Sequence, residues 1–158
     1  MNRGRFHFKS IRISIISFVL ILLTLTGLLY LMLQSSTDTN ALSEKVRHFS
    51  IVESFLNCVS SYVSWSVRQW AHVFEFLLVG IVISIFYAIR TNHVWKMFVL
   101  ALGTCVVISI CDQSTRIFIN GRHFDSFDLI LDALGYISAI IVMSVCRRIY
   151  SFCIYKRK

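Results

Sequence analysis

Charged side chains with helical spacing lie at the edges of apolar stretches of this sequence. Arg68, His72 and Glu75 follow one another at intervals of four and three residues, so a helix would place them in one stripe. Asp128 and Asp132 are four residues apart and would share one face of another helix. Because arginine can hold a carboxylate with two parallel hydrogen bonds, these residue types suit a partly dry polar site. The candidate ligand-binding residues are Arg68, His72, Glu75, Asp112, Arg116, Arg122, Asp128 and Asp132.

Three kinds of role are compatible with this set of side chains. The favoured one is a pocket for a polar or anionic group, and the plainest one is an ion-pair network that only fastens helix ends. The third is catalysis, since carboxylates and a histidine could do acid–base work or bind a hard divalent cation. The residues that could take part in it are His72, Glu75, Asp112, Asp128 and Asp132. The sequence has no HExxH, no GxSxG and no phosphate-cradling glycine loop, so it identifies neither a catalytic residue nor a cofactor.

The composition is that of one small membrane domain. The 158 residues are 56% apolar and 15% charged, whereas ordinary globular domains are about 45–50% apolar and about 25% charged. This balance excludes a soluble domain and a disordered chain. The net charge of +8 would suit nucleic acid on a soluble protein, but basic residues also flank membrane spans. We therefore expect membrane lipids as partners and no nucleic acid.

Apolar stretches predict an all-α protein with four transmembrane helices in a single domain over residues 1–158. The first is an uncharged run at 13–33, which at 1.5 Å per residue spans about 30 Å, one bilayer core. Because this run is longer than the apolar region of a signal peptide, we expect it to remain attached. The other spans are predicted at about 69–89, 94–111 and 127–146.

Two connecting segments are predicted on the extracytoplasmic side. Between residues 41 and 66 apolar residues recur every three to four positions, which is typical of an amphipathic helix. We expect this helix in the membrane interface or against the bundle, with a binding groove as the alternative. Residues 112–126 are predicted to form a polar connection that carries Arg116 and Arg122. Arg122 lies six residues before Asp128, so we expect it to fold back over the pocket and pair with a carboxylate there.

The distribution of charge predicts which side each end of the protein faces. The N-terminal segment, the turn at 90–96 and the C-terminal segment hold 11 of the 16 Lys and Arg residues, and all eight Asp and Glu residues fall on the opposite side. Cytoplasmic loops are enriched in Lys and Arg. Both termini are therefore predicted to be cytoplasmic.

The last three spans have short uncharged stretches, which brings their charged ends into the membrane boundary. These stretches, residues 76–89, 97–111 and 133–146, cover about 21–23 Å each, whereas a full span needs about 20 residues. Glu75, Asp112 and Asp132 should therefore lie at or below the outer membrane surface. Since a charge at that depth is costly unless paired or hydrated, such residues usually face a bundle interior. We expect one shared polar pocket.

The same residues resemble a pattern of the VanZ-like family of small bacterial membrane proteins. That family has a basic residue, then a histidine and an acidic residue at the start of a span, and Arg68, His72 and Glu75 match it, with Gly80 following. Further along, residues 111–135 read CDQSTRIFINGRHFDSFDLILDALG and resemble a second, moderately specific signature. Its matching positions are Asp112, Gly121, Arg122, Asp128, Asp132 and Gly135.

The resemblance covers most of the chain, although two positions depart from the second signature. Gln113 stands where the family usually has Glu, and Arg116 stands where it usually has Gln, so no role of that Glu carries over. The family name comes from a glycopeptide-resistance accessory protein that is linked to reduced teicoplanin susceptibility. The resemblance therefore implies binding or shielding at the outer leaflet, with a lipoglycopeptide or a lipid-linked cell-wall precursor as partner. The alternative is a membrane enzyme that acts on a lipid or peptidoglycan-precursor headgroup.

Overall fold

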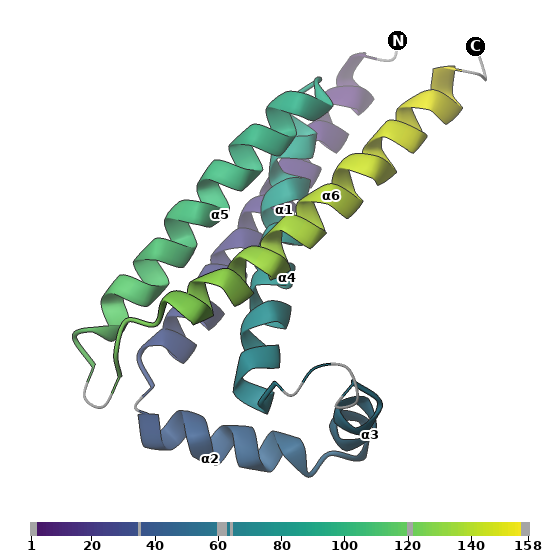
Figure 1. Ribbon diagram of the computed structural model, residues 1–158. Coiled ribbons are helices and arrows are strands. Elements are labelled where there is room, and N and C mark those ends of the chain that lie inside the picture. Colours follow the sequence, from purple (N-terminus) through teal and green to yellow (C-terminus); the bar gives the residue numbers. More distant parts are fainter. Residues whose placement is uncertain (1–2, 35, 60–62, 64, 120–121, 156–158) are drawn as a thin grey trace.

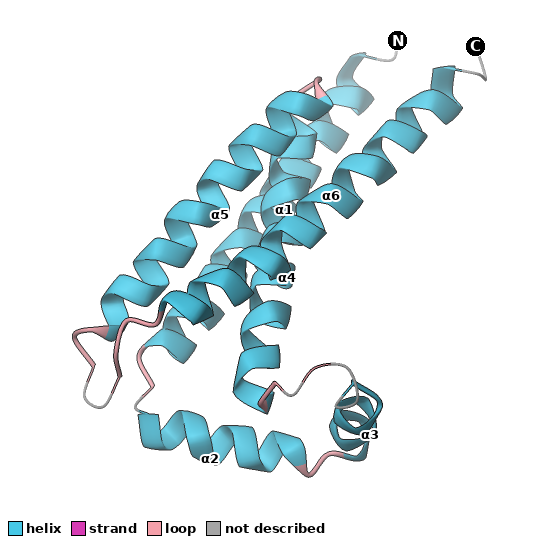
Figure 2. Ribbon diagram, viewed as in Figure 1, coloured by secondary structure: helices cyan, strands magenta, loops and turns pink. Residues whose placement is uncertain are grey.

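The structure is a computed structural model, which describes residues 3–34, 36–59, 63, 65–119 and 122–155 as helices and short connections, with no strand among them (Figure 2). The helices are α1 (Arg3–Met32), α2 (Ser36–Arg47), α3 (Ser50–Val59), α4 (Val67–Arg90), α5 (Val94–Arg116) and α6 (Ser126–Tyr155). The predicted all-α class is confirmed.

Three of these helices are long and apolar enough to cross a membrane, judged by length and composition. They are α4 with 24 residues, α5 with 23 residues, and α6 over its stretch Ser126–Cys153. In addition, α1 contributes a shorter apolar stretch, Ile15–Leu31, among its described side chains. Large apolar residues such as Leu23, Val107 and Val142 are exposed, as expected for helices that face lipid rather than water. The helices therefore suggest a membrane protein.

The four long helices form a bundle in which α4 contacts each of the other three. Figure 1 shows that α1 and α5 run in one direction and that α4 and α6 run in the opposite direction. The start of α1 and the end of α6 therefore lie at the same end of the bundle, and α2 and α3 lie across the other end (Figure 1). The basic side chains predicted for the cytoplasmic side at residues 3–12 and 156–158 lie outside the described side chains.

Two glycines allow α4 and α6 to pack closely. A Cβ added to Gly80 of α4 would lie 2.8 Å from the Cβ of Ala139, and one added to Gly135 of α6 would overlap the carbonyl oxygen of Val73. Real Cβ atoms essentially never make contacts under 3.0 Å, so both positions require glycine for this approach. The close packing fixes the height of α4 relative to α6, and these two helices carry most of the candidate site.

Local sequence determines where the helices begin. Ser66 and Gln69 form a capping box at the start of α4, in which each side chain accepts a hydrogen bond from the backbone N–H of the other residue. Asp125 plays a similar part for α6, because its Oδ1 accepts a hydrogen bond from the backbone N–H of Phe127 at 2.8 Å. The chain contains no proline, so none of the long helices has a proline kink.

The segment predicted as one amphipathic helix over residues 41–66 forms two helices instead. A turn at His48 and Phe49 separates α2 from α3, and the Phe49 N–H donates to the carbonyl of Val46 at 3.1 Å. Phe55 of α3 packs against Trp70 of α4, with ring centroids 5.1 Å apart. Residues 60–62 and 64 of the predicted helix lie outside the described residues.

The connection predicted at residues 112–126 is also shorter than expected. The helix α5 continues to Arg116 instead of ending near residue 111, and α6 extends to Tyr155 instead of ending near residue 146. Asp112 and Arg116 therefore belong to α5, which corrects the prediction that Arg116 lies in a loop. The helix can continue through these charges because they are paired inside the bundle and are not exposed to lipid.

Candidate functional site

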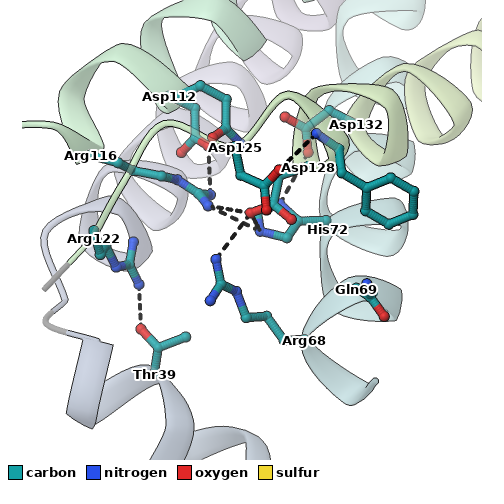
Figure 3. A network of polar contacts seen from close by, with 12 residues as sticks. Thr39, Arg68, Gln69, His72, Asp112, Arg116, Arg122, Asp125, Asp128 and Asp132 are labelled. Atoms are coloured by element: carbon teal, nitrogen blue, oxygen red, sulfur yellow. Dashed lines mark hydrogen bonds and ion pairs between the residues drawn. The ribbon is translucent and has the colours of Figure 1, made fainter. Parts of the chain in front are cut away.

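Buried charged side chains gather where α4 and α6 begin and α5 ends (Figure 3). His72 comes from α4, Asp112 and Arg116 come from α5, and Asp128 and Asp132 come from α6. All five residues are at most 6% exposed. We call these five residues and Arg68 the polar cluster. Six of the eight residues chosen from the sequence thus meet in one place.

Asp128 is the point where cations from two other helices meet. Its Oδ2 accepts hydrogen bonds from Arg68 Nη2 at 3.1 Å and from Arg116 Nη1 at 2.9 Å. The same oxygen lies 3.3 Å from His72 Nε2. The side chain of Arg68 is 43% exposed, whereas that of Asp128 is 4% exposed. One buried carboxylate therefore joins α4, α5 and α6, in a place where an unpaired charge would be costly.

Asp132 orients the imidazole of His72. Its Oδ1 lies 3.0 Å from His72 Nδ1, and its Oδ2 accepts a hydrogen bond from Ser109 Oγ at 2.8 Å. Because Nδ1 faces a carboxylate, it carries a proton. His72 Nε2 lies between Asp128 and Arg116, whose Nη1 is 3.2 Å away. This second nitrogen can therefore donate to the carboxylate when protonated, or accept from the guanidinium when neutral.

The guanidinium of Arg116 bridges two carboxylates. Its Nη2 donates to Asp112 Oδ2 at 2.6 Å, and its Nη1 donates to Asp128 Oδ2. Gln113 donates to the same oxygen of Asp112 at 3.4 Å. The planar fork of arginine suits such double recognition, which the single ammonium of a lysine cannot reproduce.

A cavity of about 130 Å³ lies beside the polar cluster and reaches the ends of α1, α2, α4 and α5. Part of its wall is apolar and part is charged. Its apolar residues are Leu31, Leu42, Val46, Val67 and Ala71, and its polar residues are Gln34, Thr39, Ser43, Arg68, His72, Glu75, Asp112, Arg116 and Arg122. The cavity could therefore hold a small polar group next to an apolar chain.

The two remaining predicted residues, Glu75 and Arg122, line this cavity. Arg122 reaches it from the connection between α5 and α6 and donates to Thr39 Oγ1 of α2. Asp128 takes guanidinium partners from Arg68 and Arg116, because α5 extends far enough to deliver Arg116. Glu75 makes no hydrogen bond or ion pair with any residue that the structure describes. Gly121 of the second signature lies outside those residues.

Sequence reasoning missed three residues that support the candidate site. Ser109 precedes Asp112 by three residues and Arg116 by seven, a helical spacing that would have identified it had α5 been extended. Gln113 stood out only as a departure from the family pattern. Thr39 gave no signal, because its contact with Arg122 joins residues 83 positions apart.

Three residues of the polar cluster could hold a metal ion by distance alone. The ligand atoms of His72, Asp112 and Asp132 lie within 4.8 Å of one another. However, the carboxylate of Asp112 already holds Arg116, and that of Asp132 already holds His72 and Ser109. A cation would have to displace the guanidinium, so the contacts favour an ion-pair network over a metal site.

The bundle and its buried charges define a small helical membrane protein with a polar cavity near one end. The family model described as VanZ/LLP1 matches residues 17–147, a range that includes the whole polar cluster and the cavity wall. The chain therefore belongs to the VanZ/LLP1 family, which confirms the resemblance found in the sequence. Searches of curated proteins and of solved structures found no match. Family membership and the apolar helices together suggest a cell-envelope membrane protein.

Proposed function

We propose that the protein binds the polar headgroup of an envelope amphiphile in its cavity, at the extracytoplasmic end of four membrane spans. In this proposal α1 is the first span, and α4, α5 and α6 are the others. The end of the bundle opposite the cavity carries Arg90, Lys96, Arg147 and Arg148. Such a basic end belongs in the cytoplasm, so both termini are cytoplasmic and the cavity faces the outer leaflet of the bacterial inner membrane.

The observation that carries this proposal is the mixed wall of the cavity. Guanidinium groups of Arg68 and Arg122 stand beside Leu31, Leu42 and Val46, which suits a molecule with a charged head and an apolar chain. The volume of about 130 Å³ is well below the roughly 300–1,000 Å³ of sites for drug-sized ligands. A headgroup fits this space, whereas a whole lipoglycopeptide does not.

Through this binding the protein would reduce susceptibility to teicoplanin-type lipoglycopeptides. These drugs carry an acyl chain and act on a lipid-linked peptidoglycan precursor at the same membrane surface. A protein that holds the precursor headgroup, or a polar part of the drug, would shield one from the other. Membership of the VanZ/LLP1 family supports this part of the proposal.

Mass spectrometry of amphiphiles that remain bound after gentle purification tests the binding. We expect an amphiphile that is enriched over an unrelated multi-span protein purified in the same way. Arg68→Gln should lose it, and Arg148→Gln, an exposed residue at the opposite end, should keep it. Equal lipid profiles for the parent, Arg68→Gln and the unrelated protein would contradict binding. Teicoplanin susceptibility of a host that expresses each variant at equal membrane level tests the resistance role separately.

A second candidate function is catalysis on the same headgroup. The observation that favours it is that His72 lines the cavity while Asp132 and Ser109 fix its orientation, an arrangement that general acid–base catalysis uses. Incubation of the purified protein with envelope lipids would then release or exchange a headgroup. His72→Gln should abolish the product but leave the amphiphile bound. Unchanged lipids after prolonged incubation with the parent protein would rule this candidate out.

A further inference from the structure

Two hydrogen-bond acceptors on the cavity wall lack donors among the residues that the structure describes. The carboxylate of Glu75 makes no ion pair or hydrogen bond among the described residues, although the side chain is only partly exposed. The side-chain oxygen of Gln34, two residues after the end of α1, is buried and likewise has no hydrogen-bond partner in the described part of the chain. A buried acceptor without a donor is costly. These two groups therefore call for a donor, and a primary ammonium brings three.

Three guanidinium groups line the same cavity. Arg68, Arg116 and Arg122 come from α4, from α5 and from the connection after α5, and Figure 3 shows their heads turned towards a common space. Burial, followed by the like charges of Arg116 and Arg68, lowers the pKa of Arg122. An anion in the cavity would offset this repulsion. Phosphate suits the position, since its several oxygens can accept from more than one guanidinium at once.

We propose that the cavity binds a lipid headgroup that carries both a phosphate and a primary ammonium, with the phosphate at Arg68 and Arg122 and the ammonium at Glu75. This inference rests on the proposed function and names the chemical class of its ligand. The apolar part of the wall, at Leu31, Leu42 and Val46, would contact the chain to which the phosphate is attached. An amine-bearing phospholipid has this combination of groups, whereas a purely anionic lipid leaves Glu75 without a partner.

Native mass spectrometry of the full chain in detergent tests the inference. The probes are phosphatidylethanolamine, N-acetyl-phosphatidylethanolamine and phosphatidylglycerol with identical short acyl chains, so that all three share the phosphate and only the first carries an ammonium. The free amine should bind about tenfold more tightly than the other two lipids, which is the size of one charge-assisted hydrogen bond. Glu75→Gln should reduce the amine-bearing lipid to the affinity of phosphatidylglycerol. The matched control Glu53→Gln, an exposed carboxylate on α3, should keep the preference.

The outcomes separate this inference from the proposed function. Equal binding of phosphatidylglycerol and phosphatidylethanolamine, or a preference that survives Glu75→Gln, would overturn the ammonium site while headgroup binding stands. Both proposals fail if none of the three lipids binds this protein more tightly than it binds an unrelated multi-span protein. Soluble phosphoethanolamine is added as a competitor in a further arm. If phosphoethanolamine competes as strongly as unlabelled phosphatidylethanolamine does, the ligand of the cavity is a free solute, and the proposal of a lipid ligand is overturned.

Discussion

At the scale of single residues, Asp128 is the carboxylate on which most of the candidate site depends. One of its oxygens faces Arg68, Arg116 and His72 at distances from 2.9 to 3.3 Å. Arg116 and His72 are themselves buried, so the charge of Asp128 cannot be replaced by water. This makes the polar cluster sensitive to changes that keep the size of a side chain but remove its charge.

The substitution Asp128→Asn tests this dependence. Removing one partner of a buried ion pair costs about 3–5 kcal/mol, so the melting temperature in detergent should fall by on the order of 10 °C. Asp125→Asn is the matched control, because Asp125 is exposed and asparagine also caps a helix. Its melting temperature should match that of the parent. Similar melting of the two variants would show that the ion pairs of Asp128 contribute little to stability.

Replacement of arginine by lysine should depend on burial. Arg116→Lys keeps the charge but loses one of two charge-assisted hydrogen bonds, with an expected cost of about 1.5–3 kcal/mol. Arg68 makes one bond to Asp128 and is partly exposed, so Arg68→Lys should cost about 1 kcal/mol or less. Urea unfolding of both variants in the same detergent measures the difference. A larger loss for Arg68→Lys would contradict the bridging role of Arg116.

The residues of the candidate site were easier to predict than their partners. Helical spacing placed Arg68, His72 and Glu75 on one stripe because neighbours on a helix surface are three or four residues apart. Which arginine pairs with Asp128 depends on how far α5 continues, and the polar residues after position 111 read as a loop. The choice between Arg116 and Arg122 therefore needed the tertiary structure.

At the scale of helices, the contact between α4 and α6 holds the two halves of the site together. His72 of α4 meets Asp128 and Asp132 of α6, and further along α6 the close approach occurs at Gly135. A helix that moves by the thickness of one methyl group would lengthen these contacts beyond hydrogen-bonding distance. The family pattern includes Gly80 and Gly135, and the structure gives both a steric reason.

Gly135→Ala should therefore damage the protein, whereas Gly103→Ala should not. The added Cβ at Gly135 would overlap the backbone of α4, and nothing lies within 4 Å of a Cβ at Gly103 of α5. We expect Gly135→Ala to lower stability by several kcal/mol, of the order of overpacking in a core or more. Gly103→Ala should be neutral or stabilising by about 0.5–1 kcal/mol. Thermal unfolding in detergent compares them, and equal melting temperatures would mean that α4 and α6 can separate freely.

Some helices could be predicted from the sequence more completely than others. Long apolar runs predicted α4, α5 and α6, because a run of that length can satisfy its backbone in lipid only as a helix. The break between α2 and α3 was not predictable, since the spacing of apolar residues continues across it. The two helices also contact α4, as Phe55 does at Trp70, and the periodicity of one segment cannot reveal such tertiary contacts.

At the scale of the whole molecule, the two ends of the bundle differ in the charged residues that they carry. The polar cluster and the cavity lie at the end covered by α2 and α3, and described basic residues such as Arg90 and Arg148 lie at the other end (Figure 1). All eight Asp and Glu residues of the sequence belong to segments at the end with the cavity. The proposed orientation follows from this asymmetry, because cytoplasmic ends are enriched in basic residues.

Cysteine labelling of whole cells tests that orientation. On a background in which all five cysteines are replaced, His123→Cys and Asn92→Cys place single thiols at exposed positions on opposite ends of the bundle. A maleimide that cannot cross the inner membrane should label position 123 in intact cells and position 92 only after lysis. Since both positions are exposed in the fold, a difference in labelling reports the side of the membrane. Labelling of position 92 but not of position 123 would place the cavity in the cytoplasm, and a headgroup from the outer leaflet could then no longer be its ligand.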